Sequence, residues 1–188
     1  MIRPRLRGER GYTLVEMLTV MIIMGVVTTA LTTVFVQATN SEADMNNRFQ
    51  AQLTARLALD KMRREVHCAS VATPTGNSSS VTLTLPSYCK TGSGSITWCT
   101  RNVATNRYAL YRIVGTTCSG GVKWADYLTP SSSAPICSGA LCIFTYTAQS
   151  ASSLAKLHVD FPINVNPSKS VETYELADDI VLRNSTRS

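Results

Sequence analysis

The sequence predicts an α+β fold, in which one long N-terminal helix packs on an antiparallel β-sheet. Three observations carry this prediction: an apolar run over residues 17–36, a stretch without glycine or proline over residues 42–67, and a change in composition at about residue 70. The chain has 188 residues, and the part that follows the apolar run is long enough for one modest domain with its own core.

The apolar run has the length and composition of a membrane-spanning helix. No charged residue occurs from Met17 to Ser41. About 20 apolar residues cross a bilayer as a helix, at about 1.5 Å per residue. The residues before the run include four arginines, Arg3, Arg5, Arg7 and Arg10. A transmembrane helix is therefore expected within residues 12–40. The positive-inside rule predicts that its N-terminus is cytoplasmic and that the remainder of the chain is exported.

Two ordinary explanations compete for this segment. A secretory signal peptide is one, because Val36-Gln37-Ala38 ends the run in a small-x-small pattern and cleavage there would leave Thr39 first. The run is longer than the usual signal peptide, however, and Glu16 would be out of place inside it. A plain signal anchor explains the length and the arginines, but it gives Glu16 no role beyond reaching the headgroups.

The stretch Gly11-Tyr12-Thr13-Leu14-Val15-Glu16 closely resembles the processing and methylation motif of type IV pilins and pseudopilins. The resemblance implies that residues 1–11 are a leader, that prepilin peptidase cuts between Gly11 and Tyr12, and that Tyr12 is then N-methylated. Tyrosine stands where the family usually has phenylalanine, which keeps an aromatic ring. The resemblance is strong over residues 1 to about 40 and weak beyond them.

The same resemblance gives Glu16 a function, because it is the fifth residue after the expected cut. In the family, the N-terminal helices form the core of a filament, and this carboxylate pairs with the N-terminal amine of a neighbouring subunit. An unpaired charge in an apolar bundle is costly, whereas a paired one is tolerated. The implied partners are prepilin peptidase, other pilin subunits and the membrane, which the chain crosses once.

Residues 41–70 are predicted to continue the helix outside the membrane, because they are rich in helix-forming residues. One apolar set recurs at every fourth residue: Met45, Phe49, Leu53 and Leu57. A second set consists of Leu59, Met62 and Val66. We expect the first set to face neighbouring subunits or the domain edge and the second to lie under the sheet. Burial of both sets in the core is an equally open alternative.

A mixed-charge run over residues 60–65 is predicted to be a solvated helix face. Residues 58–66 also resemble the helix end of minor pilins and J-type pseudopilins. The remainder, residues 71–188, is predicted to be a β-sheet domain of pilin-like architecture, with strands separated by turn-rich segments. The expected strands are Val81–Leu85, Ile96–Thr100, Tyr108–Val114, Trp124–Leu128, Leu141–Thr147, Leu154–Asp160 and Thr173–Arg183.

All the cysteines follow the apolar run: Cys68, Cys89, Cys99, Cys118, Cys137 and Cys142. An even number on one side of a membrane favours disulfides in an oxidising compartment, with free thiols or a metal site as alternatives. Six cysteines allow 15 pairings. The pairs that we favour are a local Cys137–Cys142 closure, Cys99–Cys118 around the strand at Tyr108, and Cys68–Cys89 at the helix end.

No catalytic or metal-binding motif occurs in the sequence, so neither enzymatic activity, a cofactor, a metal nor a small-molecule substrate is expected. His67 and His158 have no evident nucleophile partner. Asp178 and Asp179 are adjacent, so in a strand they point to opposite faces. The net charge is +6, but the basic residues beyond the leader are scattered, which does not favour nucleic-acid binding.

The sequence therefore predicts a minor pilin or pseudopilin, anchored in the cell membrane with its domain exported, and later part of a type IV pilus or a type II secretion pseudopilus. The alternative is a protein on a simple signal anchor whose exported domain binds a ligand or DNA, with competence pseudopilins between the two. The N-terminal residue of the mature chain separates them, because Tyr12, Met1 and Thr39 each belong to one interpretation.

Overall fold

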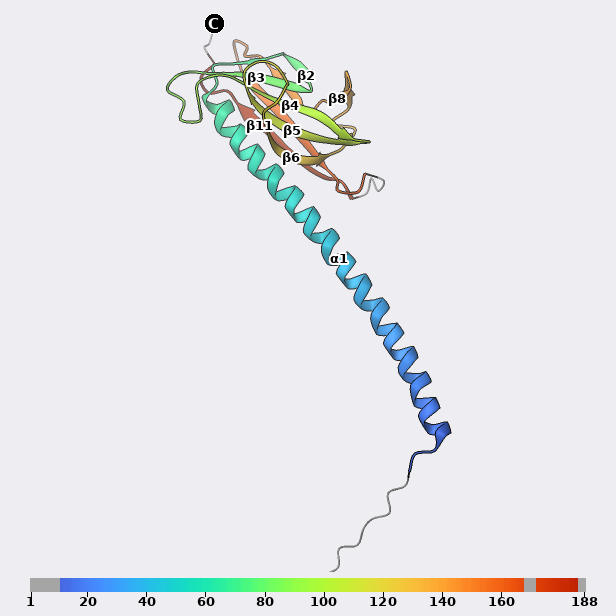
Figure 1. The fold of residues 1–188 in the computed structure, drawn as a ribbon. Helices are drawn as coiled ribbons and strands as arrows, with labels where there is room; N and C mark the ends of the chain where they lie inside the picture. The colour runs from blue at the N-terminus through green and yellow to red at the C-terminus, as the bar shows by residue number, and fades with distance from the viewer. Residues whose placement is uncertain (1–10, 168–171, 186–188) are drawn as a thin grey trace, which may run out of the picture. The chain divides into compact units, whose positions relative to one another are not determined.

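The computed structural model describes residues 11–167 and 172–185, so the first ten residues of the expected leader lie outside it. Residues 1–45 and 46–188 form two compact units. A single helix, α1 (Leu14–Cys68), begins in the first unit and ends in the second. Its last turns belong to the same unit as the β-strands, which gather beside them in Figure 1. The fold is α+β, as the sequence predicts.

The strands all follow the helix along the chain. Their bounds are β1 (Val71–Thr73), β2 (Gly76–Ser78), β3 (Ser80–Leu85), β4 (Gly94–Ala104), β5 (Arg107–Val114), β6 (Val122–Leu128), β7 (Ile136–Cys137), β8 (Ala140–Leu141), β9 (Phe144–Thr147), β10 (Lys156–Ile163) and β11 (Tyr174–Val181). Within the described residues, nine of them form one antiparallel sheet in the order β1-β3-β4-β5-β6-β10-β9-β2, with β11 also paired to β10.

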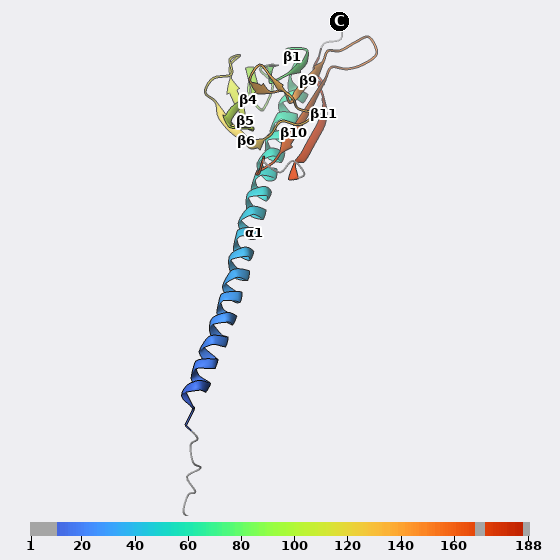
Figure 2. The ribbon, with the colours of Figure 1, turned by 90° about the vertical axis from the view of Figure 1, so that its right-hand side faces the viewer.

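The sheet is curled, and the chain itself joins its two ends. Only Ser79 separates β2 from β3, yet β2 pairs with β9 and β3 pairs with β4. The short stretch from β1 to β3 therefore supplies β2 at one end of the strand order and β1 and β3 at the other. The strand pairing is shortest between β6 and β10, which share the single pair Ile163 and Leu128. Figure 2 shows β4, β5 and β6 on one side of the helix end and β9, β10 and β11 on the other.

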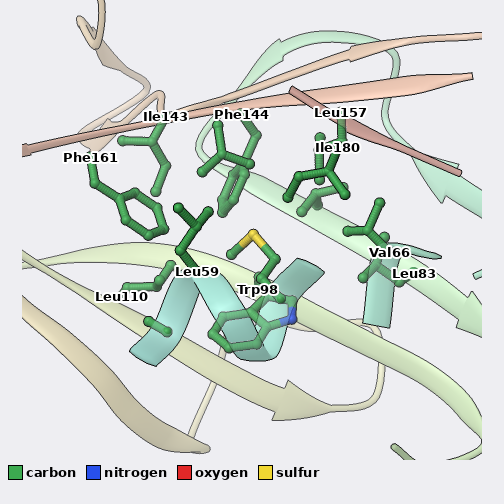
Figure 3. Close-up of a cluster of buried hydrophobic side chains, with 14 of the residues drawn as sticks. Leu59, Val66, Leu83, Trp98, Leu110, Ile143, Phe144, Leu157, Phe161 and Ile180 are labelled. Atoms are coloured by element: carbon green, nitrogen blue, oxygen red, sulfur yellow. The ribbon is translucent and has the colours of Figure 1, made fainter. Parts of the chain in front are cut away.

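The side chains on the buried face of the helix are small in its earlier turns and larger in its last turns. Ala51, Ala55 and Ala58 are buried at spacings of three and four residues, which lets the strands approach the helix backbone closely. Larger side chains follow, and Leu59 lies between Phe161 and Trp98 in Figure 3. The core thus fills the space between the last turns of α1 and the curled sheet.

A row of polar contacts joins α1 to β11 and to Glu172, which comes two residues before that strand. The pairs are Arg48 with Glu172, Arg56 with the Tyr174 hydroxyl, Arg63 with Asp178, and His67 with the Val181 carbonyl. Both residue numbers rise together, so the strand runs parallel to the helix. The 19 residue steps from Arg48 to His67 rise by about 29 Å along the helix, and nine steps at strand spacing, from Glu172 to Val181, cover about 30 Å. These similar lengths let the contacts repeat.

The expectation that residues 60–65 form a solvated face is wrong for Glu65. Its side chain is fully buried and accepts hydrogen bonds from Trp98 Nε1 at 2.8 Å and from Arg112 Nε at 2.8 Å. Lys61 Nζ lies 3.3 Å from the same carboxylate. The inner position follows from spacing, because Glu65 comes three residues after Met62 on the buried face. The sheet supplies the donors that make its burial tolerable.

The cysteines form three disulfides, Cys68–Cys89, Cys99–Cys118 and Cys137–Cys142. These are the pairs that the sequence analysis favours. The first joins the helix end to the β3–β4 loop, the second joins β4 to the β5–β6 loop, and the third closes the small β7–β8 hairpin. Each bond fixes a loop that follows or precedes a short strand.

The expected strand over residues 141–147 is wrong, because the structure divides it between β8 and β9. The backbone N–H of Cys142 donates to the Pro135 carbonyl, and the Leu141 carbonyl accepts from the Thr100 hydroxyl at 2.6 Å. These contacts turn the chain away from the ladder. The sequence also gives no sign of β2, where a Gly- and Ser-rich segment pairs with β9 because the curl brings it there.

Candidate functional site

The bond between Gly11 and Tyr12 lies outside regular secondary structure, two residues before the helix begins. Both residues are exposed, and a Cβ atom built on Gly11 would meet nothing within 4 Å. The backbone around the bond is therefore accessible as an extended segment. A peptidase could bind this segment without first unwinding the helix.

Thr13 caps the start of the helix. The backbone N–H of Glu16 lies 3.3 Å from Thr13 Oγ1, and the N–H of Met17 donates to the Thr13 carbonyl at 3.2 Å. Threonine followed by glutamate three residues later is the sequence pattern of a capping box. The sequence analysis missed this role, although the pattern Thr-x-x-Glu was there to be read. The helix start is thus fixed by the motif itself.

The carboxylate of Glu16 lies in the first turn of α1, where the positive end of the helix dipole favours a negative charge. Within residues 11–167 and 172–185, no ion pair to this carboxylate occurs. A cleaved chain would begin at Tyr12, so its new amine would lie four residues from Glu16 in the sequence.

The described residues contain one helix, α1, that is long and apolar enough to cross a membrane by length and composition. Its apolar part buries nothing within the chain, and every large apolar side chain from Tyr12 to Val36 is exposed. Hydroxyls in this part are satisfied internally, since Thr28, Thr29 and Thr32 each donate to the carbonyl four residues earlier at 2.8 Å. Such bonds let threonine lie in an apolar environment.

The two apolar sets of residues 41–70 separate as expected. Leu59, Met62 and Val66 are buried. Phe49, Leu53 and Leu57 are 61%, 40% and 53% exposed. The alternative, that both sets belong to the core, is therefore wrong. We call the exposed set, Met45, Phe49, Leu53 and Leu57, the apolar stripe.

The histidines and paired aspartates each have a structural partner. His67 Nδ1 lies 2.9 Å from the Val181 carbonyl oxygen, and His158 Nδ1 lies 2.8 Å from Asp179 Oδ1. Asp178 faces Arg63, whereas Asp179 faces His158 and Lys156, so the neighbours do point in opposite directions. Hydrogen bonds from His158 and Lys156 lower the pKa of Asp179. Among the residues described, no three His, Cys, Asp or Glu side chains form a group that could hold a metal.

One groove of about 270 Å³ lies between the second half of α1 and β6. Its walls include Asn47 and Gln50 from the helix, and Trp124 and Tyr127 from the strand. Tyr127 has a φ of 62°, a left-handed conformation that is rare for a large aromatic residue.

Asp126 stabilises the strand beside this groove. It accepts from Arg107 Nε at 3.0 Å, Lys123 Nζ at 2.8 Å and the Tyr127 N–H at 2.7 Å. Burial raises the pKa of Asp126, but the hydrogen bonds from Arg107, Lys123 and Tyr127 outweigh burial and lower the pKa to about 2. The carboxylate therefore stays ionised at neutral pH and holds the Tyr127 backbone in place.

Comparison with known proteins identifies the N-terminal segment. Residues 6–32 match the family described as the prokaryotic N-terminal methylation motif. The match includes Gly11, Tyr12 and Glu16, together with the first turns of the apolar helix. No curated protein and no solved structure matches the chain. The assignment therefore depends on the N-terminal motif and on the fold, in which a long apolar helix continues into an α+β domain. By that motif, the N-terminal segment is similar to the segment that is cleaved and methylated in prepilin-like proteins.

Proposed function

We propose that this protein is a minor pilin or pseudopilin, cut by prepilin peptidase between Gly11 and Tyr12, methylated at Tyr12, and assembled into a type IV pilus or a type II secretion pseudopilus. The observation that carries the proposal is the methylation motif at residues 6–32, which includes the capped start of the apolar helix. Proteins of this family are generally structural subunits without enzymatic activity, which agrees with the lack of a catalytic motif in the sequence.

The proposed assembly uses Glu16 and the apolar stripe. Cleavage creates an amine at Tyr12, and the carboxylate of Glu16 on a neighbouring subunit receives it in the apolar filament core. Neither the apolar part of α1 nor the stripe has a partner within the described chain, as their exposed side chains indicate. Association with the helices of other subunits would bury both surfaces and remove their contact with water.

Before assembly, the chain is a single-pass membrane protein with its N-terminus in the cytoplasm. Residues 1–11 are its leader, residues 12–40 its transmembrane and filament-core helix, residues 41–70 the exported helix, and residues 71–188 the globular domain. The three disulfides support an oxidising location for the domain. Its irregular short strands and cysteine content favour a minor subunit over the bulk subunit of a filament.

Mass spectrometry of the mature N-terminus tests the proposal. We expect the purified chain to begin at a methylated Tyr12. A chain that begins at Met1 would contradict processing and leave a signal anchor, and one that begins at Thr39 would indicate ordinary secretion.

A matched pair of glycine variants sharpens that test. Gly11→Val places a branched side chain at the expected cut and should leave an uncut precursor that migrates more slowly on a gel. Gly25→Ala changes a glycine that lies inside the helix with open space around it, so this variant should be cut normally. Normal processing of Gly11→Val would show that the cut lies elsewhere.

A second candidate function is an exported ligand-binding protein on a simple anchor, and the groove between α1 and β6 favours it. Two aromatic side chains and two carboxamides line this groove, a combination of apolar surface and hydrogen-bonding groups that suits a small ligand. The N-terminal measurement separates the two candidates, because only the pilin proposal requires Tyr12 to come first.

A further inference from the structure

The loop between β3 and β4, residues 86–93, is held to the domain mainly by one covalent bond. Cys89 is its only buried residue, and Tyr88 is largely exposed. Two internal turns shape the loop, with N–H groups of Cys89 and Gly92 donating to the Pro86 and Cys89 carbonyls. The loop therefore has no apolar anchor apart from Cys89, which is bonded to Cys68.

This loop lies against the buried ion pair of Glu65 and Arg112. A Cβ atom built on Gly92 would lie 4.0 Å from Nη2 of Arg112, so this residue of the loop faces the guanidinium group. Arg112 Nη2 in turn lies 2.8 Å from Glu65 Oε1. The Glu65 side chain is fully buried, and that of Arg112 is 17% exposed. The loop is thus part of the cover that keeps water from the pair.

The disulfide holds the loop at the right place for this role. Cys68 comes three residues after Glu65 in α1, so the two side chains lie on the same face of the helix, about one turn apart. Closing the bond brings Cys89 to that turn and Gly92 to Arg112. The ion pair also joins three elements, because Glu65 belongs to α1, Trp98 to β4 and Arg112 to β5.

We propose that the Cys68–Cys89 disulfide is a redox-controlled latch that closes residues 86–93 over the Glu65–Arg112 ion pair. In the oxidised protein the loop is closed. A dithiol reductant opens it: the S–S bond breaks, two electrons and two protons pass from the dithiol to the two cysteines, and the dithiol becomes a cyclic disulfide. The reverse oxidation closes the loop again.

Opening the latch changes the strength of the ion pair. A charge pair that is shielded from water interacts strongly and is little affected by salt, whereas an exposed pair is weakened by water and screened by ions. The joint between helix and sheet therefore reaches its full strength only after Cys68 and Cys89 are oxidised. The timing of this step depends on the proposed function, since an exported domain becomes oxidised after translocation.

The first experiment compares two disulfide variants of the full chain in detergent micelles. Cys68→Ser/Cys89→Ser removes the latch, and Cys99→Ser/Cys118→Ser is the matched control. Their sequence separations are 21 and 19, so both changes release nearly equal chain entropy. The control bond also lies on the other face of the sheet from Arg112, because Cys99 pairs with Tyr111 whereas Trp98 pairs with Arg112.

The measurement is the rate at which phenylglyoxal modifies Arg112, followed by mass spectrometry of peptides, with the more exposed Arg63 as an internal reference. We expect the rate at Arg112 to rise about tenfold or more without the latch, because local opening becomes easier, and to change little in the control. Equal rates in the two variants, or an Arg112 that stays protected without the latch, would overturn the proposal.

A second measurement applies if the latch variant does not fold. The unaltered chain is partly reduced with dithiothreitol, free thiols are trapped with N-ethylmaleimide, and Arg112 modification is compared between molecules with Cys68–Cys89 open and closed. Open molecules should carry the modification and closed ones should not. Neither experiment involves processing or filament assembly, so a failure here is distinguishable from a failure of the proposed function.

Salt provides a further readout of the same latch. Raising NaCl from about 0.05 to 1 M should lower the unfolding midpoint of the latch variant relative to the Cys99→Ser/Cys118→Ser control, because screening then reaches the pair. Adding Glu65→Gln to the latch variant should remove that difference. If Glu65→Gln leaves the salt dependence of the unfolding midpoint unchanged, other charges cause that dependence, and the result counts against the latch.

Discussion

The two parts of α1 have the same backbone structure and opposite surroundings. From residue 14 to residue 45 the helix buries none of its large apolar side chains, whereas from residue 46 onward one face is buried under the sheet. The difference teaches that helix formation does not separate the two parts; the location of their partners does. The second part packs against residues of the same chain, whereas the large apolar side chains of the first part have no packing partner among the described residues.

This comparison predicts two kinds of mutational effect. Changes in the first part should alter assembly and leave the stability of the exported domain intact. Changes on the buried face of the second part should lower stability directly. The apolar stripe is an exception. Most of it lies in the second part of α1, but its side chains are exposed, so changes in it should alter assembly and not stability.

The largest effect is expected from Glu16→Ala. Loss of the carboxylate should reduce the amount of protein in the filament fraction at least tenfold, because the Tyr12 amine of a neighbour would remain unpaired at a cost of about 3–5 kcal/mol. Membrane insertion and the unfolding midpoint of the domain should not change. Quantitative blots of filament and membrane fractions measure this, with Glu42→Ala as the control. Normal filament levels for Glu16→Ala would remove the proposed role of the carboxylate.

Glu65→Ala should produce the largest loss of stability within the domain. The variant leaves Arg112 and Trp98 Nε1 without their common acceptor, which should lower the free energy of unfolding by about 3–5 kcal/mol. Urea unfolding followed by tryptophan fluorescence measures it. Asp60→Ala is the control, since its exposed ion pair with Arg63 should contribute less than about 1 kcal/mol. Similar losses in both variants would mean that burial does not set the effect.

Met62→Ala and Leu57→Ala compare the buried face with the stripe. Met62 is fully buried, so its truncation should lower the free energy of unfolding by about 2–5 kcal/mol. Leu57 is 53% exposed, so its truncation should change stability by less than about 1 kcal/mol and lower incorporation into filaments instead. The same urea unfolding and fractionation measure both. A stability loss for Leu57→Ala as large as that for Met62→Ala would place the stripe in the core.

The smallest effect concerns pH and Asp126. The pKa of Asp126 is about 2 in the folded protein, below the usual value near 3.9 of an unfolded chain. Its lowered pKa stabilises the fold above about pH 4, and this contribution of about 2 kcal/mol is lost as the pH falls toward 2. Unfolding midpoints measured across that window should fall less steeply for Asp126→Asn than for the unaltered protein. Parallel curves would show that Asp126 does not control this loss.

The N-terminal region was largely readable from the sequence because its properties are local. Helix length, arginines, glycine, aromatic ring and glutamate follow one another within a few turns, and each acts through its immediate neighbours. The capping role of Thr13 was equally local and needed only the Thr-x-x-Glu pattern. The favoured cysteine pairs depended on nearness in sequence, and the structure holds the same pairs.

The structure of the β-sheet domain was harder to predict from the sequence, because the contacts that define it join residues that are far apart in the chain. The sequence places Glu65 in a charge run that is expected to be solvated. In the structure, the donors that allow its burial come from residues 33 and 47 positions away. β2 looked like a turn until the curl of the sheet brought β9 beside it. The groove at Tyr127 gave no signal at all, since it needs the helix and β6 together.

A helix long and apolar enough to cross a membrane, the methylation motif at its beginning and a following domain of short strands could all be inferred from the sequence, because periodicity, charge and chain length act over a few residues at a time. Only the tertiary structure decided which side of that helix is buried, how the sheet curls on it, and that one carboxylate of a charged run belongs to the core. These outcomes depend on close packing and on donors from other strands, which a linear pattern does not encode.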